Sequence, residues 1–154
     1  MSGGFRPRSL LDVAARTIAG HKSFSDNLAE FLDDFYLDES AAGRQARIRD
    51  RPDPVGDAET DLWLGATGEH LAQRWGLAVP EWTREPPFFG TGAARFYPGS
   101  PKVRPILLVE SPPAFRSRLL FTTAEPLVRA RFPGEKVRMP FDGTEASGSL
   151  QLSR

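Results

Sequence analysis

The chain of 154 residues carries 20 basic and 20 acidic side chains, so its formal net charge is zero at neutral pH. This length fits one small domain, or one domain with a tail, and the neutral balance argues against a protein that coats nucleic acid. The chain has no cysteine, which excludes disulfides, thiolate metal sites and cysteine catalysis. No run approaches about 18 consecutive apolar residues, and the first residues lack the apolar core of a secretion signal. We therefore expect a cytoplasmic protein that does not enter the membrane.

Two helices are predicted near the start of the chain. The first begins after Ser9, where Asp12 completes a capping-box-like pattern, and it ends at Gly20. Ser23 and Asp26 offer a second start of this kind. The second helix runs from about residue 24 to 37, because apolar side chains recur there at helical spacing and form one stripe. Four carboxylates of this second helix point away from most of the stripe: Asp26, Glu30, Asp33 and Asp34.

Two further helices are predicted before residue 76. A short polar helix is expected over residues 41–48, and two prolines and a glycine between residues 51 and 56 then break the chain. A long helix is predicted over residues 57–75, with Gly76 at its end. Apolar residues on both of its sides indicate a central, buried helix. The three carboxylates of its first turn are attributed to the helix dipole and not to a cation site.

The second half of the chain is rich in proline and less regular. Trp82 could anchor a partner protein, or it could fold onto its own core. The apolar run over residues 104–110 is compatible with a strand, but a helix is favoured. Ser111 and the prolines after it indicate a stop, followed by a serine-capped turn. A last short helix is expected over residues 123–130, with Thr123 as its cap.

These patterns predict a mainly α protein. A single compact domain of about five or six helices, with proline-rich irregular connections, is expected over residues 1–139, followed by a flexible C-terminal tail over residues 140–154. Its core is expected to include large apolar side chains from both halves of the chain: Phe24, Leu28, Phe31, Leu32, Phe35, Leu62, Trp63, Leu71, Trp75, Leu107, Leu108 and Phe115.

Catalytic motifs are not found in the sequence. There is no Gly-x-Ser-x-Gly elbow and no phosphate loop, and the glycines of residues 90–92 lack the remainder of a dinucleotide motif. His21 and His70 are the only histidines, and no motif links them, so no metal site and no cofactor are expected. The chain is therefore predicted not to be an enzyme. An unrecognised site near Glu110, Arg116 and His70 is the alternative that would make it one.

Charge is distributed unevenly along the chain. Residues 1–75 hold 9 basic and 13 acidic side chains, net −4, and residues 76–154 hold 11 basic and 7 acidic ones, net +4. Either the two halves attract each other or are simply solvated, or one patch binds a partner of complementary charge. The candidate residues for partner binding are Asp26, Glu30, Asp33, Asp34, Trp82, Arg116 and Arg118.

Three stretches carry a common pattern: residues 28–36 (LAEFLDDFY), residues 69–83 (EHLAQRWGLAVPEWT), and residues 110–121 (ESPPAFRSRLLF) with Leu127 and Arg129-Ala130 behind them. Together they resemble a group of small, largely uncharacterised bacterial proteins. Such proteins look like the smaller member of two-gene pairs whose other member is a nucleotidyltransferase-like protein, as in toxin–antitoxin systems. The resemblance implies an antitoxin-like role, with that toxin as the partner. It brings no catalytic motif, and the chain departs from the pattern in its 90–100 loop and its polar tail.

Three functions follow as hypotheses. The favoured one is a non-enzymatic interaction protein that binds and restrains a partner protein. The second is a helix-turn-helix DNA-binding transcriptional regulator built on the helices over residues 9–19 and 24–37, although the second helix is acidic where a recognition helix should be basic. The third is a small enzyme with the unrecognised site named above.

Overall fold

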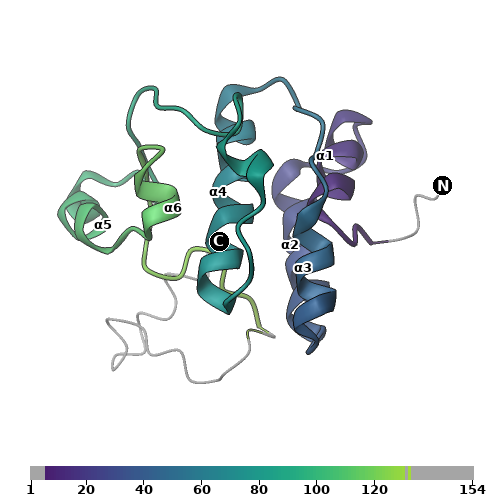
Figure 1. Ribbon diagram of the computed structural model, residues 1–154. Helices are drawn as coiled ribbons and strands as arrows, with labels where there is room; N and C mark the ends of the chain where they lie inside the picture. The colour runs from purple at the N-terminus through teal and green to yellow at the C-terminus, as the bar shows by residue number, and fades with distance from the viewer. Residues whose placement is uncertain (1–5, 131, 133–154) are drawn as a thin grey trace. The chain divides into compact units, whose positions relative to one another are not determined.

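The computed structural model describes residues 6–130 and residue 132, and its main elements in this part of the chain are six α-helices (Figure 1). The prediction of a mainly α protein with five or six helices is confirmed. The Cα positions divide the chain into an N-terminal unit, which ends at Gly90, and a C-terminal unit, which begins at Thr91. The predicted boundary between a domain and a tail, at residue 139, lies outside the described residues.

The N-terminal unit begins with two helices that have serine caps, as predicted. Helix α1 spans Leu10–Ile18 and helix α2 spans Phe24–Leu37. In each case the hydroxyl of the preceding serine, Ser9 or Ser23, accepts the backbone N–H three residues further on at 3.1 Å. Helix α1 ends just before Gly20, whose φ of +79° is a conformation that glycine adopts without strain.

A buried asparagine fixes the turn between these two helices. The Nδ2 group of Asn27 donates to the carbonyl oxygen of His21 at 2.9 Å and to the hydroxyl of Thr17 at 3.2 Å. Its Oδ1 atom accepts from Nε of Arg16 at 3.1 Å. Both polar ends of the amide are therefore paired inside the protein, and α1 is held against α2.

Helices α3 and α4 complete the N-terminal unit. Helix α3 spans Ala41–Arg49 and buries only Ile48, in agreement with the polar pattern of its sequence. Helix α4 spans Ala58–Trp75; Asp57 caps its start and Gly76, with φ +71°, its end. Helices α1 and α3 both pack against α4, which is buried along most of its length, as a central helix should be.

Two glycines of α4 let an irregular segment lie close to the helix. This segment follows α4, contains the 3-10 turn η1 (Glu81–Arg84), and continues to residue 89. A Cβ atom on Gly65 would lie 2.1 Å from the carbonyl oxygen of Phe88, and one on Gly68 would lie 3.1 Å from the ring of Trp82. The absence of side chains at these two positions therefore makes room for the core that the segment contributes.

The C-terminal unit is built from shorter elements. In chain order these are β1 (Arg95–Phe96), the 3-10 turn η2 (Pro101–Val103), α5 (Arg104–Glu110), α6 (Pro113–Arg116) and β2 (Leu120–Phe121). The two strands pair in parallel, and the rings of Phe96 and Phe121 stack with centroids 5.1 Å apart. The apolar run over residues 104–110 is therefore a helix, as favoured from the sequence.

Ser111 connects the end of α5 to the chain that follows β2. Its hydroxyl donates to the carbonyl oxygen of Leu107 at 2.6 Å and accepts the backbone N–H of Thr122 at 2.8 Å. The prediction that this serine caps the next turn is wrong, because Pro112 occupies the N-cap position of α6 and makes no side-chain cap bond. The hydroxyl is used for a contact between segments that are distant in sequence.

The prediction of a helix over residues 123–130 is also wrong. No helix forms within this segment: residues 126–127 make a turn, and Leu127 is buried at 4% exposure. A helix of eight residues forms few internal hydrogen bonds to offset its costly first turn. The bond that holds Thr122 to α5 and the burial of Leu127 therefore decide the conformation.

Most of the predicted core residues are buried, with one clear exception. Leu108 is 49% exposed, because it lies about 100° around α5 from the buried Leu107. Phe24, Trp63 and Trp75 are half-buried. The other predicted core residues are buried: Leu28, Phe31, Leu32, Phe35, Leu62, Leu71, Leu107 and Phe115.

Candidate functional site

Four of the predicted partner-binding residues lie on one helix, α2, and form what we call the acidic face: Asp26, Glu30, Asp33 and Asp34. Asp26 is exposed and the other three are half-buried. Lys22, in the preceding turn, forms an ion pair with Glu30. The hydrogen bond from Lys22 lowers the pKa of the Glu30 carboxyl, against the opposing effect of desolvation. The face is therefore acidic, but a basic residue of the same unit compensates part of its charge.

Arg47 of α3 compensates a second part of this charge. Its guanidinium lies 3.7 Å from the Asp34 carboxylate and donates from Nε to the Asp38 carboxylate at 3.1 Å. Arg6 also lies 3.7 Å from Asp34. The backbone N–H of Ser40, and then Arg47, lower the pKa of Asp38, while desolvation opposes them. Ion pairs that remain partly open to solvent contribute little to stability, so the main effect of these pairs is to reduce the negative field of the acidic face.

The acidic face also bears on the DNA-binding hypothesis. Helices α1 and α2 are joined by a short fixed turn, as that hypothesis requires. A recognition helix lies between two rows of phosphates, however, and needs basic or neutral side chains there. The solvent side of α2 presents carboxylates instead. The geometry therefore disfavours α2 as a recognition helix.

Trp82 does not belong to a surface. Its side chain is 3% exposed, its indole N–H donates to the carbonyl oxygen of Ile48 at 3.0 Å, and its ring meets the ring of Phe88 edge-on at 5.1 Å. The structure therefore leaves no exposed Trp82 ring for a surface anchor. The alternative prediction, that Trp82 folds onto its own core, is confirmed.

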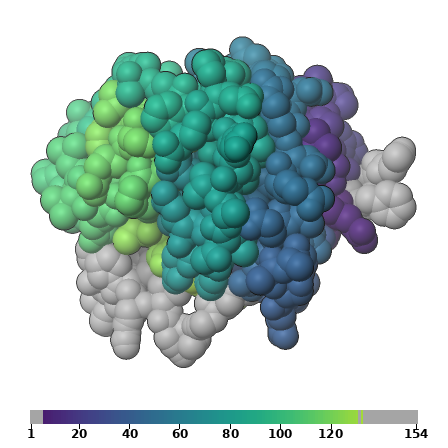
Figure 2. Space-filling view, viewed as in Figure 1, coloured from purple at the N-terminus to yellow at the C-terminus, as the bar shows by residue number. Residues whose placement is uncertain are grey.

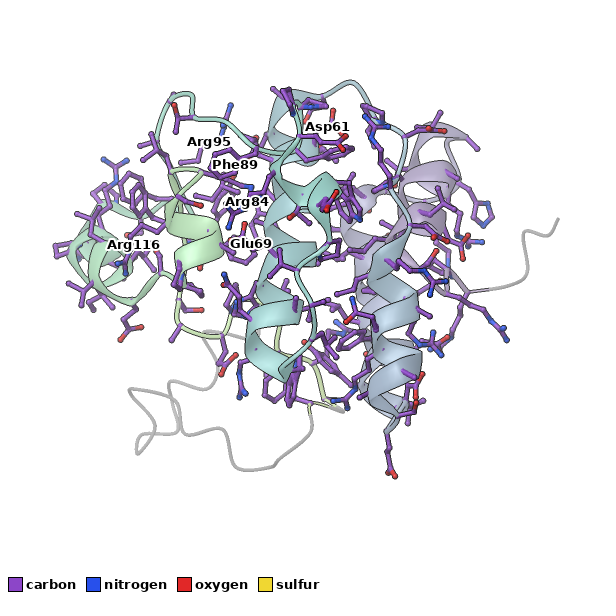
Figure 3. All side chains as sticks on the ribbon, viewed as in Figure 1. Asp61, Glu69, Arg84, Phe89, Arg95 and Arg116 are labelled. Carbon is purple, nitrogen blue, oxygen red and sulfur yellow. The ribbon has the colours of Figure 1, made fainter. Side chains whose placement is uncertain are left out.

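The two candidate arginines have different environments. Arg118 is fully buried and donates from Nη1 to the carbonyl oxygen of Ala114 at 2.6 Å, so it offers no surface to a partner. Arg116 is exposed, and its Nη2 group donates to the carbonyl oxygens of Val109 at 2.9 Å and Ser111 at 2.7 Å. Arg116, which Figure 3 labels beside α5, thus holds the C-terminal end of this helix while the residue stays exposed to solvent.

The sequence did not predict the surface that α5 presents. Three of its aliphatic side chains, which we call the α5 apolar face, are exposed: Ile106 at 38%, Leu108 at 49% and Val109 at 75%. With about 100° per residue, these three lie on the side of the helix away from the buried Leu107. The C-terminal unit, drawn in green, includes this helix at the surface (Figure 2). The sequence did contain a signal for this exposed surface. Residues 106–109 place apolar side chains on every side of the helix, but a helix packed against a core on one side can bury only that side.

A buried carboxylate organises the middle of the N-terminal unit (Figure 3). The Glu69 side chain is 4% exposed, and its Oε2 atom accepts from Arg84 at 2.7 Å and from Gln73 at 3.1 Å. The guanidinium of Arg84 lies over the ring of Phe89, 5.5 Å from its centroid. The charge of Glu69 is therefore paired, and the pair attaches the segment over residues 81–89 to α4.

Asp61, one of the carboxylates at the start of α4, has a structural role. Its side chain accepts the backbone N–H of Val55 at 2.8 Å and that of Gly56 at 3.1 Å. The residue is 2% exposed. This carboxylate therefore holds the loop before the helix in place.

Two residues named for the enzyme hypothesis have shifted pKa values. Burial, and next the charge of Arg74, lower the pKa of His70 from 6.5 to about 4. Burial raises the pKa of the Glu110 carboxyl above its usual range, and the backbone N–H of Ala124 acts in the opposite direction. His70 belongs to the N-terminal unit and Glu110 to the C-terminal unit, and the cause of both shifts is mainly burial. Arg116, the third residue named for that hypothesis, belongs to the C-terminal unit, and its side chain binds backbone carbonyl oxygens.

Metal-binding groups and membrane-spanning helices are both missing from the described part of the chain. Within residues 6–130 and 132, no three or more His, Asp or Glu side chains lie close enough together to hold a metal ion. None of the helices in these ranges has the length and apolar character needed to cross a membrane. No protein-family model, curated protein or solved structure matches the chain.

Proposed function

We propose that this chain is a non-enzymatic interaction protein that binds and restrains a partner protein. The observation that carries the proposal is the α5 apolar face, which exposes three aliphatic side chains on one short helix, with Val109 at 75%. Single exposed apolar residues are ordinary on protein surfaces, but neighbouring ones on a well-held helix favour burial against another macromolecule. A function of this kind needs a shaped surface and no catalytic group.

The partner is proposed from the resemblance of three sequence stretches to the small members of two-gene pairs. On this proposal the chain is antitoxin-like, acts in the cytoplasm, and holds a nucleotidyltransferase-like toxin inactive. Two of those stretches lie in different units. Residues 69–83 of the N-terminal unit include the end of α4 and most of η1, and residues 110–121 of the C-terminal unit run from the end of α5 to β2.

The test is co-expression with the product of the neighbouring gene, with an affinity tag on that product alone. We expect the two proteins to purify together, and we expect co-expression to relieve growth inhibition caused by the neighbouring product. Clean separation of the two at micromolar concentration would contradict the proposal. A shift of promoter DNA by this chain alone would instead favour the DNA-binding regulator.

A further inference from the structure

The α5 apolar face is held in a fixed orientation. Leu107 is 1% exposed and anchors the helix from the other side. The hydroxyl of Ser111 binds the carbonyl oxygen of Leu107, and the guanidinium of Arg116 binds that of Val109. The exposed aliphatic side chains therefore belong to a helix that is fixed at its C-terminal end, and binding them requires little ordering of the backbone.

The apolar face has basic side chains at both of its ends. Lys102 in η2, just before α5, and Arg104, the first residue of α5, are exposed, and so is Arg116 after its end. The guanidinium of Arg104 lies 4.7 Å from the centroid of the Phe96 ring, which restricts its position. Glu110, the acidic residue of α5, is half-buried, and burial raises its pKa. The surface is therefore apolar in the centre and positive at the rim.

This arrangement selects among possible occupants. A second copy of the chain that presented the same face would bring basic rims against each other, which is unfavourable. Nucleic acid would pair with the rim but would leave the aliphatic centre uncovered. A protein surface with an apolar cleft and carboxylates around it satisfies both the centre and the rim.

We infer that the α5 apolar face docks into an apolar cleft rimmed by Asp and Glu side chains on the partner protein, with Ile106, Leu108 and Val109 as its aliphatic contacts. The inference rests on the proposed function and adds to it the location of the contact and the chemistry of the surface that is bound. Lys102 and Arg104 contribute charge at one end of the contact, and Arg116 at the other.

The experiment replaces Val109 with the photo-crosslinking residue p-benzoylphenylalanine in the full-length chain, inside cells that carry the neighbouring gene. The matched control carries the same residue at Val79, which is 38% exposed on the N-terminal unit. We expect position 109, and not position 79, to give one discrete adduct with the neighbouring gene's product. Mass spectrometry of the adduct should find the attachment in a segment that combines aliphatic or aromatic residues with Asp or Glu.

A charge variant tests the rim separately. Lys102→Glu reverses an exposed charge in η2, just before α5, and we expect it to slow association with the purified partner about tenfold at low salt. Arg49→Glu is the control, because Arg49 is also exposed but lies on α3 in the N-terminal unit. Equal effects of the two variants would contradict a role for the rim of α5.

The outcomes separate the inference from the proposed function. Co-purification of the partner without a crosslink from position 109 would leave the proposed function standing and overturn the docking surface. An adduct of twice the chain's own mass, or one with lipid or nucleic acid, would also overturn it. Failure of both co-purification and crosslinking would overturn the two together.

Discussion

The two units of this chain are stabilised in different ways. The helices of the N-terminal unit have 9, 14, 9 and 18 residues, and a side chain caps the start of each. The helices of the C-terminal unit have 7 and 4 residues and lack a side-chain cap, and its strands have two residues each. Local signals suffice to define the first kind of element, whereas the second kind depends on contacts between segments that are far apart in sequence.

The two units also differ in how they use the residues that the sequence marks as conspicuous. In the N-terminal unit the conspicuous residues are used internally: Trp82 is buried, Glu69 pairs with Arg84, and Asp61 binds the preceding loop. In the C-terminal unit the short helix α5 keeps three aliphatic side chains exposed. Long amphipathic helices can bury one continuous stripe, but a two-turn apolar helix leaves part of its apolar surface in water.

The largest expected effect tests the aromatic core of the N-terminal unit. Phe31 is fully buried, and its ring lies 5.8 Å from that of Phe35. Phe31→Ala should lower the free energy of unfolding by about 3–5 kcal/mol, through lost burial and the cavity left behind. Chemical denaturation measures this loss. Leu37→Ala, at a position 54% exposed on the same helix, should change stability by only about 0.5 kcal/mol, and a loss below about 1 kcal/mol for Phe31→Ala would contradict the assignment of the core.

The next effect tests the close approach between α4 and the irregular segment after it. Alanine is the better helix former by about 1 kcal/mol, yet a Cβ atom on Gly65 would lie 2.1 Å from a backbone oxygen of Phe88. The steric effect should dominate, so Gly65→Ala is expected to destabilise the protein by about 3 kcal/mol. Gly92→Ala is the control, because its added Cβ meets nothing within 4 Å. If thermal unfolding shows Gly65→Ala to be neutral, the segment does not lie as close to α4 as described.

Prediction from sequence succeeded where the signal is local. Ser9 and Ser23 mark the starts of α1 and α2, because capping depends on residues only three positions apart. The acidic face of α2 was likewise predictable, since helical spacing alone places its carboxylates on the side away from the core.

Prediction failed where the deciding contact is distant in sequence. The side of α5 that meets the core is set by Ser111 and Thr122, whose hydrogen bond spans eleven positions. Nothing in the apolar run over residues 106–109 indicates that Leu107 is buried and Leu108 is not. The two-residue strands were missed for a similar reason, because each exists only through pairing with the other.

A third effect depends on pH and belongs to the N-terminal unit. The pKa of His70 is about 4 in the folded protein, below its ordinary value of 6.5, so the unfolded chain binds more protons between these values. The stability that His70 contributes is present above pH 6.5 and is lost as the pH falls toward 4. Acidification from pH 7 to 5 should therefore lower the free energy of unfolding by about 2 kcal/mol.

The His70→Gln variant should lose this pH dependence in denaturant titrations at the two pH values. His21→Gln, which keeps His70, should retain it. An equal slope in His70→Gln and the unchanged protein would show that another group is responsible.

The smallest expected effect returns to the C-terminal unit and its dependence on distant polar contacts. Ser111→Ala removes the acceptor of the Thr122 N–H, and Thr122 is only 2% exposed, so water does not easily replace the lost bond. An unpaired buried donor of this kind should cost between about 1 and 2 kcal/mol of unfolding free energy. Ser117→Ala in the same unit is the matched control, because Ser117 is exposed and its hydroxyl bond to Ala114 is 3.2 Å long. The rate of amide hydrogen exchange at Thr122 should rise in Ser111→Ala and not in Ser117→Ala. Unchanged protection of this amide in Ser111→Ala would mean that the C-terminal unit does not depend on this contact. The unit would then resemble the N-terminal unit more than its short elements suggest.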